Sequence, residues 1–185
     1  MEHHTGIFAS SGVTSAAQLP LPGLDAPGGT KDLEGLLNGT GSGPSRAFDV
    51  AHEGFVRTMV SSWSEASGYY IFGPMYAAFN PDGTGALPPM DGSKDSYITV
   101  ALMLAHPLSR GSVHVTGAGP DQTQAIDPGY LSHPFDLEVM VRHVQFIEQV
   151  LTVTEPLAEW LKPDGKRAAG APEAGALKDL KVAKK

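Results

Sequence analysis

The sequence predicts an α+β protein with a mostly antiparallel sheet and helices on one side of the sheet. Three observations predict this fold. Apolar residues recur at helical spacing from residue 46, they alternate as in a strand over 97–104, and a second helical stripe follows residue 136. The expected order is helix, three strands, helix, and the short connections between strands favour antiparallel pairing.

The length and composition favour one soluble domain. With 185 residues, of which 41% are hydrophobic and 18% charged, the chain can form a sizeable core. The formal net charge of −7 argues against nucleic acid as a partner, and the absence of cysteine excludes disulfides and thiolate zinc sites. No apolar run reaches the ~18 residues of a membrane span. Because the N-terminus lacks a signal-peptide pattern, we expect a cytoplasmic protein.

The first part of the chain divides into a loop-rich segment and a helix. Residues 1–45 are rich in glycine, serine and proline and are expected to be largely loop, apart from a strand near Ile7. A helix is expected from Arg46 to Gly68, where the glycine ends it in the C′ position. The apolar face of this helix is expected to consist of Phe48, His52, Phe55, Met59 and Trp63.

Three strands are expected in the middle of the chain. The first, Tyr69–Phe79, is aromatic and is interrupted at Gly73. The second is the clearest, because its apolar residues alternate over 97–104. The third, 111–116, is expected to pair with the second as an antiparallel hairpin, since the connection between them is short. One face of the second strand is expected to carry Ile98, Val100, Leu102 and Leu104.

A long helix is expected after these strands. Asp136 is its predicted N-cap, and Glu138 is predicted to pair with Arg142 one turn later. A short helix is expected after Pro156. The domain organisation is therefore 1–45, largely loop, then a folded region over 46–165, then a basic Ala/Lys-rich tail over 166–185. The apolar stripe of the long helix is expected to be Leu137, Met140, Val141, Val144, Ile147, Glu148 and Leu151.

Two glycine-rich segments imitate a dinucleotide-binding fingerprint. Residues 41–46 and 117–122 each begin Gly-x-Gly but lack the third glycine, and Pro120 has no N–H to offer a pyrophosphate. Ordinary turns explain both segments better. We therefore expect the isolated chain to hold no cofactor of its own.

The candidate binding residues are a histidine and a group of aromatic side chains. None of the 7 histidines shows the i, i+4 pairing of a helical zinc site, so no metal site is expected. His106 either closes the end of a strand or lies near a pocket, where it could act as an acid or base. The aromatic residues either pack in the core or line an apolar substrate cavity. They are Tyr69, Tyr70, Phe72, Tyr76 and Phe79, of which the first four, with His106, are the predicted substrate-binding residues.

Two segments resemble the fungal branch of the glucose–methanol–choline (GMC) flavin oxidoreductases. They are His-Pro-Leu-Ser-Arg-Gly-Ser-Val at 106–113 and Asp-Pro-Gly-Tyr-Leu at 127–131, and the helical run 137–143 fits the helix that follows them in that family. The resemblance covers roughly residues 46–185. It implies the substrate-binding domain, a large antiparallel sheet with helices that covers the flavin ring and shapes the alcohol pocket.

The resemblance also implies what lies outside this region. Family members oxidise CH–OH groups with FAD; their flavin-binding glycine motif precedes the matched region and their catalytic histidine segment follows it. No catalytic residue is therefore assigned in this chain. FAD is expected only if a complementing chain supplies its binding domain.

Three functions stay open on the sequence. The chain is a truncated or split GMC oxidoreductase-like protein, a non-redox cyclase or isomerase acting on an apolar metabolite, or a ligand-binding module. The expected partners are an apolar small-molecule substrate and either a flavin-domain chain or a second copy, because a substrate-binding domain normally buries one face. That face is expected near the aromatic residues of 69–79.

Overall fold

The computed structural model describes residues 12–27, 29–38, 47–80, 82, 84–86, 95–119, 121–162, 165 and 167. The chain divides into two compact units. Unit 1 comprises residues 1–19, 68–103 and 144–185, and unit 2 comprises residues 20–67 and 104–143. Helix α3, Pro134–Val153, contributes residues to both units.

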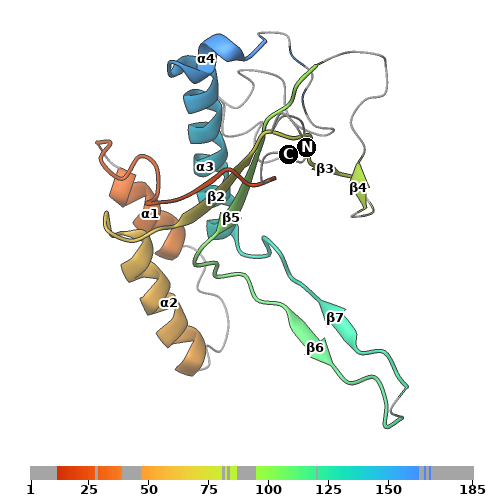
Figure 1. Ribbon diagram of the computed structural model, residues 1–185. Coiled ribbons are helices and arrows are strands. Elements are labelled where there is room, and N and C mark those ends of the chain that lie inside the picture. Colours follow the sequence, from red (N-terminus) through yellow and green to blue (C-terminus); the bar gives the residue numbers. More distant parts are fainter. Residues whose placement is uncertain are drawn as a thin grey trace. The chain divides into compact units, whose positions relative to one another are not determined.

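Unit 1 contains a three-stranded sheet in the order β1-β2-β5, whose strands lie side by side in Figure 1. The strands are β1, Ser15–Leu19, β2, Gly68–Gly73, and β5, Thr99–Leu104. Strands β1 and β2 are antiparallel, with Ala17 opposite Tyr70. The pairing extends beyond β1, because the backbone N–H of Thr14 donates to the carbonyl of Phe72 at 2.9 Å.

Smaller elements complete unit 1. Strands β3, Ala78–Phe79, and β4, Gly85–Ala86, form an antiparallel pair. Helix α4, Leu157–Trp160, follows Pro156, as predicted. The guanidinium of Arg167 donates to both carboxylate oxygens of Glu148 at 2.9 and 2.6 Å, which fixes this residue of the tail against α3.

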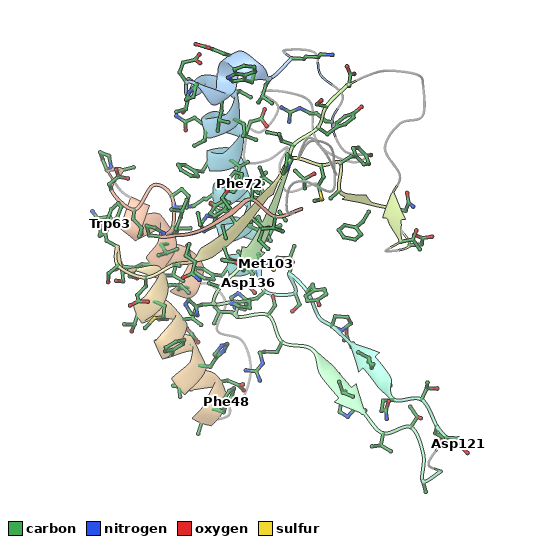
Figure 2. All side chains as sticks on the ribbon, viewed as in Figure 1. Phe48, Trp63, Phe72, Met103, Asp121 and Asp136 are labelled. Carbon is green, nitrogen blue, oxygen red and sulfur yellow. The ribbon has the colours of Figure 1, made fainter. Side chains whose placement is uncertain are left out.

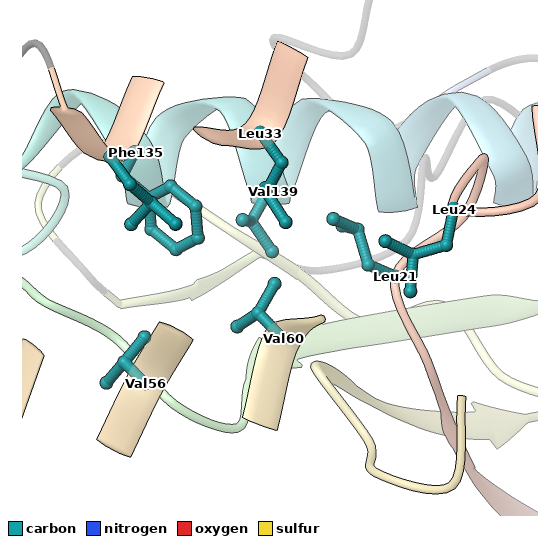
Figure 3. Packing of buried hydrophobic residues seen from close by; sticks show 8 residues of the cluster. Leu21, Leu24, Leu33, Val56, Val60, Phe135 and Val139 are labelled. Atoms are coloured by element: carbon teal, nitrogen blue, oxygen red, sulfur yellow. The ribbon is translucent and has the colours of Figure 1, made fainter. Parts of the chain in front are cut away.

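Unit 2 is built mainly from helices around one apolar core. Its helices are α1, Gly29–Asn38, α2, Ala47–Val60, and the first half of α3. A separate antiparallel pair, β6, Ser112–His114, and β7, Ala125–Asp127, completes it. Figure 3 shows the core, whose buried members are Leu21, Leu24, Leu33, Leu37, Val56, Val60, Phe135 and Val139.

The core explains which face of each helix turns inward. Phe135 and Val139 lie four residues apart and place one face of α3 against Val56 and Val60 of α2. Each such side chain contributes roughly 1.5–3 kcal/mol on full burial. The predicted apolar face of α2 is wrong, because Phe48, Phe55 and Trp63 are 59%, 49% and 58% exposed.

The fold class is α+β with antiparallel sheets and helices, as predicted. The interruption of the aromatic strand at Gly73 is confirmed, since β2 ends there and β3 begins at Ala78. The alternation is confirmed from Val100 to Leu104, but the predicted face does not include Ile98, which precedes β5 and is 46% exposed. Val100 and Leu102 are half-buried, whereas Ala101 and Met103 are exposed.

The predicted hairpin between 97–104 and 111–116 is wrong. Strand β5 joins the sheet of β1 and β2, while β6 pairs with β7, placing Val113 opposite Ile126. The connection between β5 and β6 does not close a tight turn, because a side chain of α3 binds its backbone. The carboxylate of Asp136 accepts hydrogen bonds from the N–H groups of Leu108 and Ser109 at 2.8 and 2.6 Å.

Helix α2 ends eight residues before the predicted glycine, at Val60, and Gly68 begins β2 instead. The serines that follow explain the stop. The hydroxyl of Ser62 lies 3.0 Å from that of Ser64 and accepts the backbone N–H of Ser64 at 3.3 Å. Such local bonds compete with helical hydrogen bonding.

The prediction that residues 1–45 are largely loop missed strand β1 and helix α1. The strand expected near Ile7 and the glycine segment 41–46 lie outside the described residues, as does the tail beyond Arg167. In the part of the chain that the structure describes, no helix is long and apolar enough to cross a membrane.

Candidate functional site

Strand geometry separates the predicted aromatic residues of unit 1. Side chains alternate between the faces of a strand, so Tyr70 and Phe72 lie on one face of β2 and Tyr69 on the other. Tyr70 is 1% exposed, whereas Tyr69 and Phe72 are half-buried. The four predicted aromatic residues therefore do not form one cluster on this strand.

Tyr70 and Phe72 line a small apolar hollow between the sheet and the second half of α3. The hollow is small, with a volume of about 40 Å³, well below the roughly 300–1,000 Å³ of most ligand pockets. It suits a hydrocarbon group rather than a reacting polar centre, because every residue lining it is apolar except for the tyrosine hydroxyl. The lining residues are Ala17, Leu19, Tyr70, Phe72, Phe146, Ile147, Val150 and Leu151.

Burial determines the chemistry of the tyrosine in this hollow. Loss of hydration raises the pKa of Tyr70 to about 12. The phenol is therefore neutral at physiological pH. It is not a base at that pH, and its ring packs beside the residues of α3 that line the hollow.

The fourth predicted aromatic residue, Tyr76, lies beyond the end of β2. Its ring meets that of Tyr97 edge to face, with the centroids 5.1 Å apart. The hydroxyl of Thr99 donates to the carbonyl of Met75 at 2.7 Å and accepts the N–H of Ala77 at 3.0 Å, which holds the segment before β5 against this one.

Tyr97 is a candidate that the sequence patterns did not single out. Its hydroxyl is buried and has no hydrogen-bond partner among the described residues. A buried hydroxyl without a partner costs free energy, so we expect a water molecule or a polar group outside the described residues to bind it. The only signal in the sequence is an aromatic residue just before the apolar alternation of β5.

The predicted histidine belongs to unit 2. The ring of His106 meets Phe55 of α2 edge to face at 5.5 Å. About two turns earlier on this helix, Phe48 stacks on His52 at 5.9 Å and the guanidinium of Arg110 lies 4.8 Å from the Phe48 ring centroid. His106 is thus part of an aromatic and cationic surface between α2 and the loop 104–111.

The two family-like segments of unit 2 lie side by side where Ser112 pairs with Asp127, and one carboxylate of the following helix binds the first segment. Asp136, which is 1% exposed, accepts the two backbone N–H groups of Leu108 and Ser109. The hydroxyl of Ser109 in turn accepts the N–H of His133 at 3.0 Å. We refer to Leu108, Ser109, His133 and Asp136 as the Asp136 node.

The node corrects the predicted role of Asp136. The helix begins at Pro134, so Asp136 is its third residue and not its N-cap. The ring nitrogen Nδ1 of His133 accepts the N–H of Phe135 at 3.2 Å and takes the capping role. The predicted pair of Glu138 and Arg142 is confirmed, at 3.2 Å.

The described residues test two further patterns, a metal-ligand cluster and the glycine segment 117–122. They contain no group of three histidine, aspartate or glutamate side chains that could hold a metal ion. Gly117 and Gly119 lie in the connection between β6 and β7, where the N–H of Gln122 bonds to the carbonyl of Gly119. This is a strand–turn–strand unit, whereas a flavin fingerprint requires a glycine loop between a strand and a helix.

Comparisons with known proteins support the resemblance that the segments 106–113 and 127–131 indicated. A family model described as GMC oxidoreductase, for the C-terminal part of these proteins, matches residues 107–181. Dehydrogenase citC of Monascus ruber is 45% identical over 67 residues, which are 36% of this chain and 10% of that protein. The chloroplastic fatty acid photodecarboxylase of Chlamydomonas reinhardtii is 31% identical over 136 residues, 69% of this chain and 22% of its own length.

A solved structure supports the fold. A fungal aryl-alcohol oxidase superposes with a TM-score of 0.63 at 20% identity, over 97% of this chain and 28% of that one. The chain thus spans between a tenth and under a third of these proteins. Its sequence and fold are those of a GMC oxidoreductase-like C-terminal domain. Residues 107–181 match the C-terminal part of the GMC oxidoreductase family, and the chain as a whole is similar to the substrate-binding portion of fungal members.

Proposed function

We propose that the chain supplies the substrate-binding portion of a GMC enzyme that oxidises the CH–OH group of an apolar alcohol, and that a complementing chain supplies the FAD-binding portion. Either a truncated or a split oxidoreductase fits this role. The expected cytoplasmic location is part of the same proposal.

The Asp136 node is the observation that carries the proposal. Two segments that resemble the same family, 106–113 and 127–131, meet at the pair Ser112 and Asp127. The buried Asp136, on the helix that follows the second segment, binds the backbone of the first. The residues that carry the resemblance are therefore also in contact with one another in this chain.

The substrate class follows from the side chains of unit 1. The hollow beside Tyr70 and Phe72 is apolar, and the buried hydroxyl of Tyr97 beside Tyr76 is a donor without a partner in the described chain. We propose that the apolar part of the substrate contacts these aromatic residues. Two predicted residues lie elsewhere: Tyr69 on the opposite face of β2 and His106 in unit 2. We propose that they contact other parts of the substrate or the complementing chain.

The hollow also supports a second function, that of a ligand-binding module without catalysis. The apolar lining favours this function, and the volume of about 40 Å³ accommodates a small hydrocarbon group such as the end of a chain. A non-redox cyclase or isomerase would need, in addition, an acid or base close to the ligand. The neutral Tyr70 is the one ionisable residue among those lining residues.

A chimera tests the primary proposal. Residues 12–162 replace the segment of the fungal aryl-alcohol oxidase on which this chain superposes, so the exchange includes the aromatic residues of unit 1 and His106. We expect the chimera to keep the yellow colour of bound flavin and measurable alcohol oxidation. The same chimera with Asp136→Asn is the control. It should lose both the flavin colour and the alcohol oxidation, because the hydrogen bonds of Asp136 to the backbone of Leu108 and Ser109 are weakened.

Other results would overturn the proposal. A folded chimera that binds flavin but oxidises no alcohol would argue against the substrate-binding role. Turnover of an apolar metabolite by the chain alone, without flavin in its absorbance spectrum, would favour the isomerase. Saturable binding of a hydrocarbon ligand without turnover in either setting would favour the binding module.

A further inference from the structure

The pair of strands β6 and β7 forms an arm, residues 112–127, with no third strand beside it in the described residues. Figure 1 shows the two strands as a separate ribbon, and Figure 2 shows Asp121 at its tip. A two-stranded ribbon is marginally stable in water by itself. An additional contact is therefore expected to cover part of it.

One face of the arm is apolar and exposed. Val113 lies opposite Ile126, and these side chains are 66% and 69% exposed. Val115, two residues along the same face, is 82% exposed. The other face carries Ser112, His114, Ala125 and Asp127.

The two edges of the arm differ in their protection against pairing with a further strand. Charged residues and proline commonly block such pairing. Strand β7 has both, since Asp127 closes it and Pro128 follows. From Gly111 to Thr116, the segment of β6 contains neither proline nor a carboxylate or lysine. The outer edge of β6 is thus the open one.

The sequence of this open edge is nearly symmetric about its centre. Ser-Val-His-Val-Thr, residues 112–116, has the same kinds of side chain in either direction around His114. In an antiparallel pair of two such strands centred on His114, Val113 lies opposite the Val115 of the second strand and Ser112 opposite its Thr116. Pairs of valines and of hydroxyl residues are both favourable across strands.

We propose that β6 pairs with β6 of a second copy of this chain, antiparallel and about a two-fold axis at His114. The two arms then form a continuous four-stranded sheet in the order β7-β6-β6-β7. The pairing satisfies the open backbone groups of β6 and joins the two apolar faces into one. Beside the paired His114 side chains, the charged group on the same face is Asp127, which β7 contributes.

The proposed interface is small, because it joins one five-residue segment of each copy. Stable protein interfaces bury about 1,200–2,000 Å² in total. We therefore expect weak association, with a dissociation constant of the order of 10–100 μM. This inference does not depend on the proposed oxidoreductase function.

Cross-linking tests the register directly, because the chain has no cysteine of its own. In the proposed pair the two His114 Cα atoms are about 4.5–5.5 Å apart, within the range of a disulfide. Mild oxidation should convert His114→Cys into a covalent dimer. Thr116→Cys should stay monomeric, since its two copies are about 13 Å apart along the strands.

Sedimentation tests the association without a cross-link. The unmodified chain should shift towards dimer up to about 200 μM. His114→Lys would place two ammonium groups side by side at the two-fold axis, so this variant should stay monomeric. Ala125→Lys adds a lysine on the same face but on β7, so this variant should still dimerise. Three results would overturn the proposal. They are an unmodified chain that stays monomeric, equal loss of dimer in both lysine variants, and equally fast cross-linking of both cysteine variants.

Discussion

The hydroxyl oxygen of Ser67 lies 2.8 Å from Nε2 of His143, and both side chains are buried in unit 2. The carbonyl of Ser67 also accepts the N–H of Ala105 at 3.0 Å, so this serine links α3 to the end of β5. Burial lowers the pKa of His143 from 6.5 to about 4, because the imidazolium form would lose its hydration.

The first prediction concerns stability in acid. Between pH 6.5 and about 4 the unfolded chain protonates this histidine and the folded chain does not, so the free energy of unfolding falls as the pH falls. The loss from His143 should reach about 3 kcal/mol near pH 4. Urea unfolding at several pH values measures it. His143→Gln should flatten the dependence in this interval, whereas the exposed His114→Gln should leave it unchanged.

The second prediction concerns the Asp136 node. Asp136→Asn replaces one acceptor oxygen with an NH₂ group that faces the N–H of Leu108 or Ser109. We expect a loss of about 1.5–3 kcal/mol in unfolding free energy, the usual range for a hydrogen bond to a charged group. Denaturant unfolding measures the loss. Asp121→Asn, at the exposed tip of the arm, is the matched control and should change stability by less than about 0.5 kcal/mol. Equal effects of the two substitutions would contradict this role of Asp136.

The third prediction tests the alternation in β5. Val100→Asp places a carboxylate on the half-buried side of the strand and should lower the melting temperature clearly, because an unpaired charge loses hydration there. Ala101→Asp, one residue further on the exposed side, should have little effect. If Ala101→Asp lowered the melting temperature more than Val100→Asp did, the faces assigned to this strand would be wrong.

The fourth prediction separates two phenylalanines. Phe135 is 1% exposed in the core of unit 2, so Phe135→Ala should cost about 3–5 kcal/mol. Phe79, from the aromatic segment after β2, is 73% exposed, and Phe79→Ala should cost little. Thermal or denaturant unfolding of both variants checks the contrast. A large loss for Phe79→Ala would show that this ring is covered by a contact outside the described residues.

The sequence by itself determined the features that depend on local periodicity and local chemistry. The alternation of Val100 and Leu102, the break at Gly73 and the pair of Glu138 with Arg142 each involve residues a few positions apart. The family followed from the short segments 106–113 and 127–131, whose residue identities are specific without any structure.

Tertiary structure decided the rest, because strand partners and helix faces depend on residues distant in the chain. Strand β6 pairs with β7 and not with β5, since the backbone of the connecting loop binds Asp136, 27 and 28 residues further on. The face of α2 that carries Val56 and Val60 is buried, because it packs against Phe135 and Val139 of α3. The face with Phe48 and Phe55 is exposed instead. Tyr70 and Tyr69, adjacent in sequence, lie on opposite faces of one strand, and packing against α3 decides which of them is buried.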